Sequence, residues 1–269
     1  NVILNRENIT KEWIEGIDFF ICGSDQIWNP TYGTTSELAF CSFAPEKTVC
    51  MSPSFGVSKI PEYREKEYSI WLKKIKALSV REIAGQKIIK NLTGRMAEVL
   101  LDPTMLVSSK TWENICKEPE NKLPDHYIVC YFLGRVDKSY YKKIRDFSKK
   151  KALPVVMLFD ILTPEYYVYD PAEVLYTIKH ADYVLTDSFH GSVFSILFHK
   201  DFYVFTRNEG GLNMNSRIET LLEKFDLNDR LFVGESSDIS SEKWCLTEHI
   251  LENEREKAKN YYVRMSDVR

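Results

Sequence analysis

The sequence predicts an α/β protein with parallel sheets divided between two lobes. Short apolar runs that end in polar or glycine residues alternate with segments of helical period, and a charged stretch rich in proline interrupts this alternation near residues 103–124. Strands that alternate with helices favour parallel sheets covered on both faces. The 269 residues, 44% of them hydrophobic, are enough for more than one core.

The individual elements follow from these runs. Eight apolar runs are the predicted strands, at 19–22, 48–51, 78–80, 99–101, 127–133, 155–159, 183–185 and 202–205. Helical spacing predicts helices at 63–76, 84–92, 139–150, 171–180, 193–199 and 218–225, and one long charged helix at 241–263.

The interrupted stretch marks a boundary between lobes at about residues 104–124. We therefore expect one Rossmann-like lobe at 1–104, a second at 125–240, and a C-terminal helical segment at 241–269 that packs back on the first lobe.

Composition excludes several classes of protein. The net charge of -3 is not the basic excess of a nucleic-acid binder. The six cysteines include no CxxC pair and no His cluster joins them, so neither a metal site nor a cofactor is expected, and the thiols fit a reducing compartment. No apolar run is long enough to span a bilayer, which favours a soluble cytoplasmic protein and leaves docking on a membrane surface open.

The richest segment is "TDSFHGSVFS", residues 186–195. It places His190 and Gly191 at a turn from a buried strand to a helix, where α/β sheets bind ligands. Amides at Ser188 to Gly191 favour an anion there, and Gly191 allows a close approach. A structural histidine is the alternative for His190. Asp187 either orients His190 or caps the helix, and the sequence does not decide between these.

Three further segments carry candidate site residues. In "GSDQIW", Ser24, Asp25 and Gln26 follow a strand and suit sugar hydroxyls; Trp28 either stacks on a sugar ring or belongs to the core. Arg81 precedes a helix and can fork onto a phosphate or carboxylate, or pair with Glu82 or another acid. Arg217 lies in the first turn of a helix, where a cation opposes the dipole, which hints at another use than a surface ion pair.

These stretches, in this order, resemble the polysaccharide pyruvyl transferase family. The matching stretches are "GSDQIWNP", "PSFG", "SVRE", "LDPT", "TDSFHGSVFS" and "NMNSRIETLL". The resemblance implies two Rossmann-like lobes similar to the glycosyltransferase-B architecture, with a cleft between them. It implies phosphoenolpyruvate as donor, and as acceptor a sugar of a cell-surface polysaccharide or of its precursor, which can be lipid-linked. Family members usually open with one more strand-helix unit, so we expect the first lobe to be truncated at its N-terminus.

The resemblance carries active-site roles onto His190 and Arg81, and a donor-binding role onto Arg217. Phosphoenolpyruvate carries a carboxylate and a phosphate, which suit Arg81, Arg217 and the amides at Ser188 to Gly191. His190 is the expected acid, and Asp25 or Asp187 the group that accepts the hydroxyl proton. The alternatives are a glycosyltransferase of the same architecture that uses a nucleotide sugar, and a non-catalytic sugar-binding module.

Overall fold

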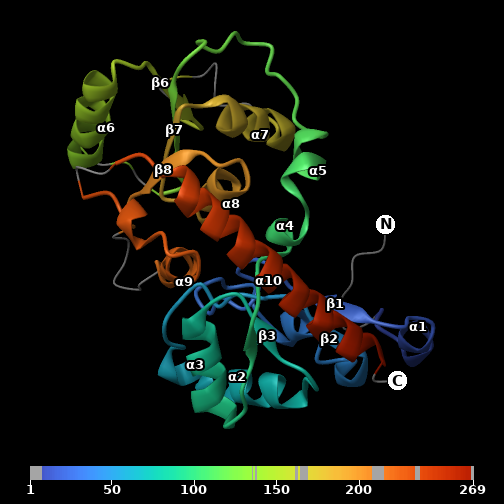
Figure 1. The fold of residues 1–269 in the computed structure, drawn as a ribbon. Coiled ribbons are helices and arrows are strands. Elements are labelled where there is room, and N and C mark those ends of the chain that lie inside the picture. The colour runs from blue at the N-terminus through green and yellow to red at the C-terminus, as the bar shows by residue number, and fades with distance from the viewer. Residues whose placement is uncertain are drawn as a thin grey trace. The chain divides into compact units, whose positions relative to one another are not determined.

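The computed structural model describes residues 8–134, 136, 138–160, 163, 169–207, 215–233 and 237–267. The chain divides into two compact units. Unit 1 comprises Asn1–Pro103, Leu212–Arg217 and Glu254–Arg269, and unit 2 comprises Thr104–Gly211 and Ile218–Asn253. All described sheets are parallel, so the molecule is a mixed α/β protein (Figure 1).

Unit 1 contains two short parallel sheets. β1 (Phe20–Cys22) pairs with β2 (Thr48–Cys50), and β3 (Ser79–Val80) pairs with β4 (Glu98–Val99). The helices of this unit are α1 (Lys11–Glu15), α2 (Glu62–Lys74) and α3 (Ile83–Thr93), with 3-10 turns η1 (Glu37–Phe40) and η2 (Pro45–Lys47). One aromatic core joins them: Trp28, Phe40, Phe55 and Tyr68 are fully buried and in ring contact.

Unit 2 contains a four-stranded parallel sheet in the order β6-β5-β7-β8. Its strands are β5 (Ile128–Tyr131), β6 (Val155–Leu158), β7 (Tyr183–Thr186) and β8 (Asp201–Val204). Its helices are α4 (Pro103–Leu106, apart from Pro103), α5 (Ser109–Glu113), α6 (Lys138–Lys151), α7 (Pro171–His180) and α8 (Phe189–Leu197), with the 3-10 turn η4 (Asn228–Arg230). Two helices are shared between the units: α9 (Ser216–Lys224) belongs to unit 1 up to Arg217 and then to unit 2, and α10 (Ser241–Asp267) belongs to unit 2 up to Asn253 and then to unit 1.

Helices cover both faces of this sheet because its strands are apolar on both sides. Ile144 and Phe147 of α6 pack on Cys130 and Leu185 at one face. α8 contacts β7 and β8, and α7 contacts α8 (Figure 1). The sheet order reverses between β5 and β7, since β6 lies on one side of β5 and β7 on the other. Such a reversal is where doubly wound sheets bind ligands, at the carboxyl ends of the strands.

The predicted strands and helices are present with shifted ends. Among the starts of the predicted helices, that of α8 shifts most, from residue 193 to Phe189. The helix begins early because Ser188 caps it: the Ser188 hydroxyl accepts a hydrogen bond from the Gly191 amide. Among the helices formed by described residues, none is long and apolar enough to cross a membrane.

Candidate functional site

In unit 1, the loops that follow β1, β2, β3 and β4 are bonded to one another. The Ser54 amide donates to the Asp25 carbonyl at 2.8 Å, and the Arg81 amide donates to the Pro53 carbonyl at 3.2 Å. The Ser52 hydroxyl donates to the Leu101 carbonyl at 2.7 Å. These bonds bring the residues after each strand to one place in the unit.

Arg81 lies at the centre of this place and is buried. Its Nη1 is 2.5 Å from Oδ2 of the buried Asp102, and its Nη2 is 3.1 Å from Oδ1 of Asp25. The Ser24 hydroxyl donates to the same Asp102 oxygen at 2.8 Å. Asp102 therefore orients Arg81, and Asp25, whose side chain is 63% exposed, connects it to solvent.

Arg217 approaches the same carboxylate. It is buried in the first turn of α9, and its Nη1 lies 3.9 Å from Asp25 Oδ1. With the Gln26 amide turned so that its oxygen faces the guanidinium, Gln26 accepts from both Nη atoms at 3.2 Å. Ser24, Asp25, Gln26, Arg81 and Arg217 thus form one cluster.

The guanidinium groups of this cluster already have carboxylate partners among the described residues. Two guanidinium groups face two carboxylates, those of Asp25 and Asp102. The sequence predicts that the two arginines bind an anionic ligand and does not identify these carboxylate partners. An anion that bound both guanidinium groups from the side of Asp25 would compete with Asp25 Oδ1, which lies 3.1 Å from Arg81 Nη2 and 3.9 Å from Arg217 Nη1.

Glu82, the acid next to Arg81 in the chain, has a different use. It is fully buried, and its Oε1 accepts from the Ser54 hydroxyl at 3.1 Å and the Phe55 amide at 2.9 Å. Burial raises the pKa of the Glu82 carboxyl, although the Arg81 guanidinium and these hydrogen bonds lower it. Glu82 therefore anchors the loop after β2.

Trp28 is a correction to the expected sugar-binding residues. Its side chain is 0% exposed, its ring stacks on Phe40 at a centroid distance of 4.8 Å, and its Nε1 donates to the Ala39 carbonyl. A ring without a solvent-facing side cannot stack on a sugar. Trp28 belongs to the core, which was the alternative interpretation of the sequence.

In unit 2, Asp187 ends the connection from β7 and bridges to β5. Its two carboxylate oxygens accept from the amides of Leu133 and Gly134, at 2.7 and 2.9 Å, and from Nε and Nη2 of Arg207, at 2.9 and 3.1 Å. Neither alternative considered from the sequence describes these partners. Asp187 therefore connects the segments that follow β7 and β5, the two strands between which the sheet order reverses. The residue that caps α8 is Ser188.

The turn at Ser188 to Gly191 is used by the protein itself. The Ser188 amide donates to Thr186 Oγ1 and the Gly191 amide donates to Ser188 Oγ. A Cβ on Gly191 would lie 3.1 Å from Thr186 Cβ and closer still to Oγ1. Gly191 therefore admits the Thr186 side chain rather than a ligand. The expected anion site on these two amides is corrected accordingly.

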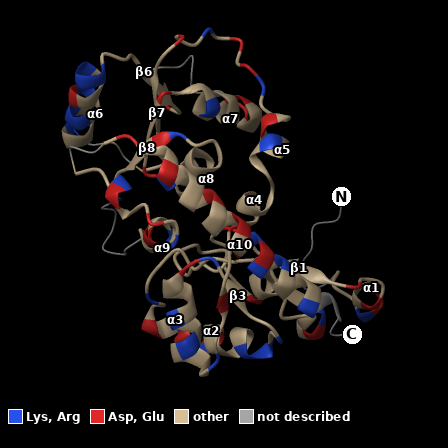
Figure 2. Ribbon diagram, in the orientation of Figure 1, with Lys and Arg blue, Asp and Glu red and all other residues tan. Residues whose placement is uncertain are grey.

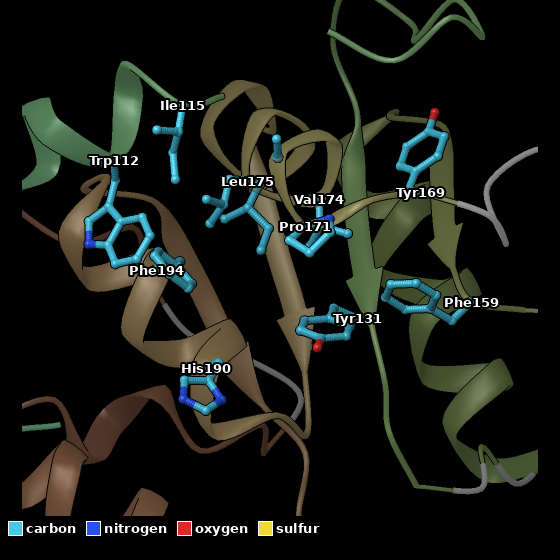
Figure 3. Close-up of a pocket in the computed structure, with 12 residues that line it drawn as sticks. Trp112, Ile115, Tyr131, Phe159, Tyr169, Pro171, Val174, Leu175, His190 and Phe194 are labelled. Atoms are coloured by element: carbon cyan, nitrogen blue, oxygen red, sulfur yellow. The ribbon is translucent and has the colours of Figure 1, made fainter. Parts of the chain in front are cut away.

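His190 is half-buried in the first turn of α8 and lines a pocket of about 390 Å³ within unit 2. Figure 3 shows its ring at one end of the pocket, with Trp112 and Phe194 beyond it and Tyr131 across from it. Tyr131 ends β5 and Phe159 follows β6, so the pocket lies at the carboxyl ends of the strands. Its lining is mostly aromatic and aliphatic.

Comparison with known proteins gives the family. The model of the family described as polysaccharide pyruvyl transferase matches residues 2–209. This chain belongs to the polysaccharide pyruvyl transferase family. A search among curated proteins gave no match to this pyruvyl transferase family member. Its "GSDQ", "PSFG", "SVRE" and "LDPT" stretches are the ones that meet around Arg81 in unit 1.

Two site residues of this family member were missed from the sequence. Asp102 lies in "LDPT" directly after the apolar run 99–101, the same position after a strand that singled out Asp25 and Arg81. Arg207 lies two residues after Phe205, in the loop that follows β8. Its bidentate ion pair with Asp187 is visible in the structure and has no signal in the local sequence. Within the described residues no group of three His, Cys, Asp or Glu side chains is placed to hold a metal ion.

Proposed function

We propose that this polysaccharide pyruvyl transferase takes the pyruvyl group from phosphoenolpyruvate and forms a ketal on a sugar of a cell-surface polysaccharide or its precursor. We propose further that it does so in the cytoplasm, on an architecture of the glycosyltransferase-B kind. Beyond family membership, the supporting observation is the pair of buried arginines, Arg81 and Arg217, that converge on the exposed carboxylate of Asp25.

The arginines are the proposed receptor for the donor. A guanidinium forks onto a carboxylate or phosphate, and Asp102 already orients Arg81 by a short bond. An anionic group of phosphoenolpyruvate takes the place of Asp25 Oδ1. Asp25 is then free to accept a hydrogen bond from the acceptor hydroxyl. Because one anion replaces another beside the two arginines, their positive charges stay compensated.

His190 is the proposed acid. A proton from its imidazolium goes to the methylene carbon of the donor, which becomes the methyl group, and a sugar hydroxyl bonds to the central carbon and gives its proton to Asp25. The C–O bond to phosphate then breaks, phosphate takes up a proton, and a second hydroxyl of the sugar closes the ketal with loss of its own proton. Water must be kept out because it competes with the hydroxyl, and the apolar lining beside His190 fits that need.

Phosphate release tests this proposal. Wild-type protein, phosphoenolpyruvate and a panel of glycans should yield inorganic phosphate and a new ketal signal by NMR. His190→Gln should lower turnover about a hundred- to ten-thousand-fold with donor affinity largely kept, since a general acid contributes about that factor. The rate of the wild type should also decline at higher pH, where the imidazole in the donor complex loses its proton. His180→Gln is the matched control, because His180 is an exposed histidine at the end of α7 whose Nδ1 bonds its own helix.

The same assay separates the alternatives. Turnover of a nucleotide sugar without phosphate release from phosphoenolpyruvate would indicate a glycosyltransferase. Binding of phosphoenolpyruvate or sugar with no turnover would indicate a non-catalytic module. A folded His190→Gln variant with wild-type turnover would remove His190 from the chemistry.

A further inference from the structure

A second pocket lies in unit 1, next to the arginine cluster. It has a volume of about 350 Å³, and its lining includes Asp25, Gln26, Tyr32, Thr34 and Thr35. It differs from the pocket at His190 in its chemistry, because carboxylate, amide, hydroxyl and phenol groups line it beside apolar surface that includes Ile27 and Ala39. Nothing in the proposed handling of the donor uses Tyr32 or Thr34.

Several polar groups of this pocket are open to a ligand. Asp25 contacts both arginines through Oδ1, and its Oδ2 has no hydrogen bond from any described residue. The Thr34 hydroxyl is exposed and likewise makes no hydrogen bond to the described part of the chain. Tyr32, which also lines the pocket, is 44% exposed.

Hydrogen bonds with buried and half-buried residues hold the loop that carries Tyr32 and Thr34. Asn29 is fully buried, its Oδ1 accepts from both the amide and the hydroxyl of Thr31, and its carbonyl accepts from the Thr35 hydroxyl at 2.7 Å. Arg64 of α2 donates to the Pro30 carbonyl at 3.0 Å and the Thr35 carbonyl at 2.7 Å. The pocket is therefore formed before a ligand arrives, which lowers the entropic cost of binding.

We propose that this pocket binds the acceptor sugar, with Tyr32 as the stacking surface and Asp25 and Thr34 as partners for its hydroxyls. The proposal rests on the proposed pyruvyl transfer for the role of the sugar as acceptor. A carboxylate in the lining disfavours a second anion, and polar groups set beside apolar surface favour a ligand that presents both. A neutral polyol with one C–H face matches a carboxylate, a hydroxyl and an exposed aromatic ring in one small space.

This placement gives Asp25 two connected tasks. Its Oδ2 accepts from a sugar hydroxyl, and its Oδ1 is the atom that the donor displaces from Arg81 and Arg217. Tyr32 also supplies, four residues along the chain, the aromatic surface that was expected from Trp28. The acceptor hydroxyl is thereby presented to the carboxylate that receives its proton.

Saturation-transfer NMR without any donor tests the sugar site. The probes are methyl glycosides of glucose, galactose, mannose and their N-acetylhexosamine counterparts, titrated against the whole chain. We expect at least one of them to bind wild type, and Tyr32→Ala to weaken that sugar about tenfold, as loss of an aromatic contact implies. Tyr32→Phe should bind nearly as wild type because it keeps the ring, and Thr34→Val should weaken binding severalfold because it removes a hydroxyl.

Tyr63→Ala is the matched control, since Tyr63 of α2 is 84% exposed and away from the pocket lining. Circular dichroism of each variant verifies the fold. Absence of saturation transfer from every sugar, or equal affinity in wild type and folded Tyr32→Ala, would overturn the inference. Failure of phosphate release with sugar binding that still depends on Tyr32 would instead sink the proposed transferase activity and leave the sugar site standing.

Discussion

At the residue scale, Asp25 is the side chain through which the unit 1 cluster meets solvent. The Oδ1 atom of its carboxylate lies against Arg81 and Arg217, which are themselves buried, and the residue also lines the pocket at Tyr32. A short acidic side chain in such a position can be displaced from cations by a ligand of the same charge. The geometry of Arg81 decides how well that ligand is held.

Replacing Arg81 with Lys should weaken binding of phosphoenolpyruvate by about ten- to a hundredfold, because hydrogen bonds to charged groups contribute about 1.5–3 kcal/mol and an ammonium loses the fork. Arg81 uses separate nitrogens for Asp102 and Asp25, and one ammonium cannot reproduce both. Isothermal titration calorimetry measures the affinity. Arg95→Lys is the control, since Arg95 donates to backbone carbonyls at the end of α2. Unchanged affinity in a folded Arg81→Lys variant would contradict the donor role.

Glu82 should make stability depend on pH. Burial raises the pKa of its carboxyl in the folded state, so folding favours the protonated form. This stabilisation is complete below the unfolded pKa and is lost as pH rises through the folded pKa. Relative to Glu82→Gln, the free energy of unfolding of the wild type should therefore decrease as pH rises from the unfolded to the folded pKa of Glu82. Above the folded pKa the difference between the two proteins should stay constant. Urea unfolding of both proteins between acidic and neutral pH measures this. A free energy of unfolding of wild type, relative to Glu82→Gln, that stays constant or increases as pH rises would rule out the raised pKa.

At the element scale, α8 shows how a helix start positions chemistry. Ser188 caps the helix, Gly191 lets Thr186 reach under its first turn, and His190 is thereby placed beside the apolar pocket. Thr186 in turn donates to the Tyr131 carbonyl at 2.6 Å, which ties the end of β7 to the end of β5. The position of His190 therefore depends on the close contact between Gly191 and Thr186, which a methyl group added at Gly191 would disturb.

Gly191→Ala should destabilise the protein by about 1–3 kcal/mol, because the added methyl has to displace the Thr186 side chain in a packed site. Ser188→Ala should cost about 1 kcal/mol through loss of the cap. Gly16→Ala is the matched control, since a Cβ there meets its neighbours at ordinary contact distances of 3.7 and 3.8 Å. Thermal and urea unfolding measure all three. Equal melting temperatures of Gly191→Ala and Gly16→Ala would contradict the close packing of Gly191 on Thr186.

At the scale of the whole molecule, positive charge is concentrated although the net charge is -3. α6 carries seven Lys or Arg residues and one Asp in fourteen residues, and Figure 2 shows this helix largely in blue. Its apolar residues Ile144 and Phe147 pack on the sheet, and most of its cations are exposed. Peripheral binding to an anionic membrane surface, left open by the composition, thus has a physical candidate in α6.

We expect the protein to bind vesicles that contain phosphatidylglycerol more tightly than vesicles of phosphatidylcholine, and to release them at high salt. Each cation near an anionic surface contributes about 1 kcal/mol, so Lys142→Gln, Arg145→Gln and Lys149→Gln together should weaken binding by about a hundredfold. Cosedimentation measures this. The same change at Lys66, Lys73 and Lys74 of α2 is the control, because acidic residues are interspersed there. Equal binding to both vesicle types would exclude the role of α6.

Much of the architecture could be read from local pattern. The strands and helices occur where apolar runs and helical spacing predicted them, and the family was evident from short motifs at strand ends. Alternation, caps and turn residues act over a few neighbours, so the chain encodes them locally. For the same reason the sequence identified Ser24, Asp25, Gln26 and Arg81 as residues that emerge at strand ends.

What the sequence could not decide were the partners of those residues across the fold. Only the packed structure shows that Asp102 orients Arg81, that Asp187 holds Arg207 and the chain after β5, and that Gly191 yields space to Thr186. It likewise assigns Trp28 to the core and leaves Tyr32 open to a ligand. These outcomes depend on strand order, register and loop path, which bring together residues distant in the chain, and no local pattern specifies which two side chains will meet.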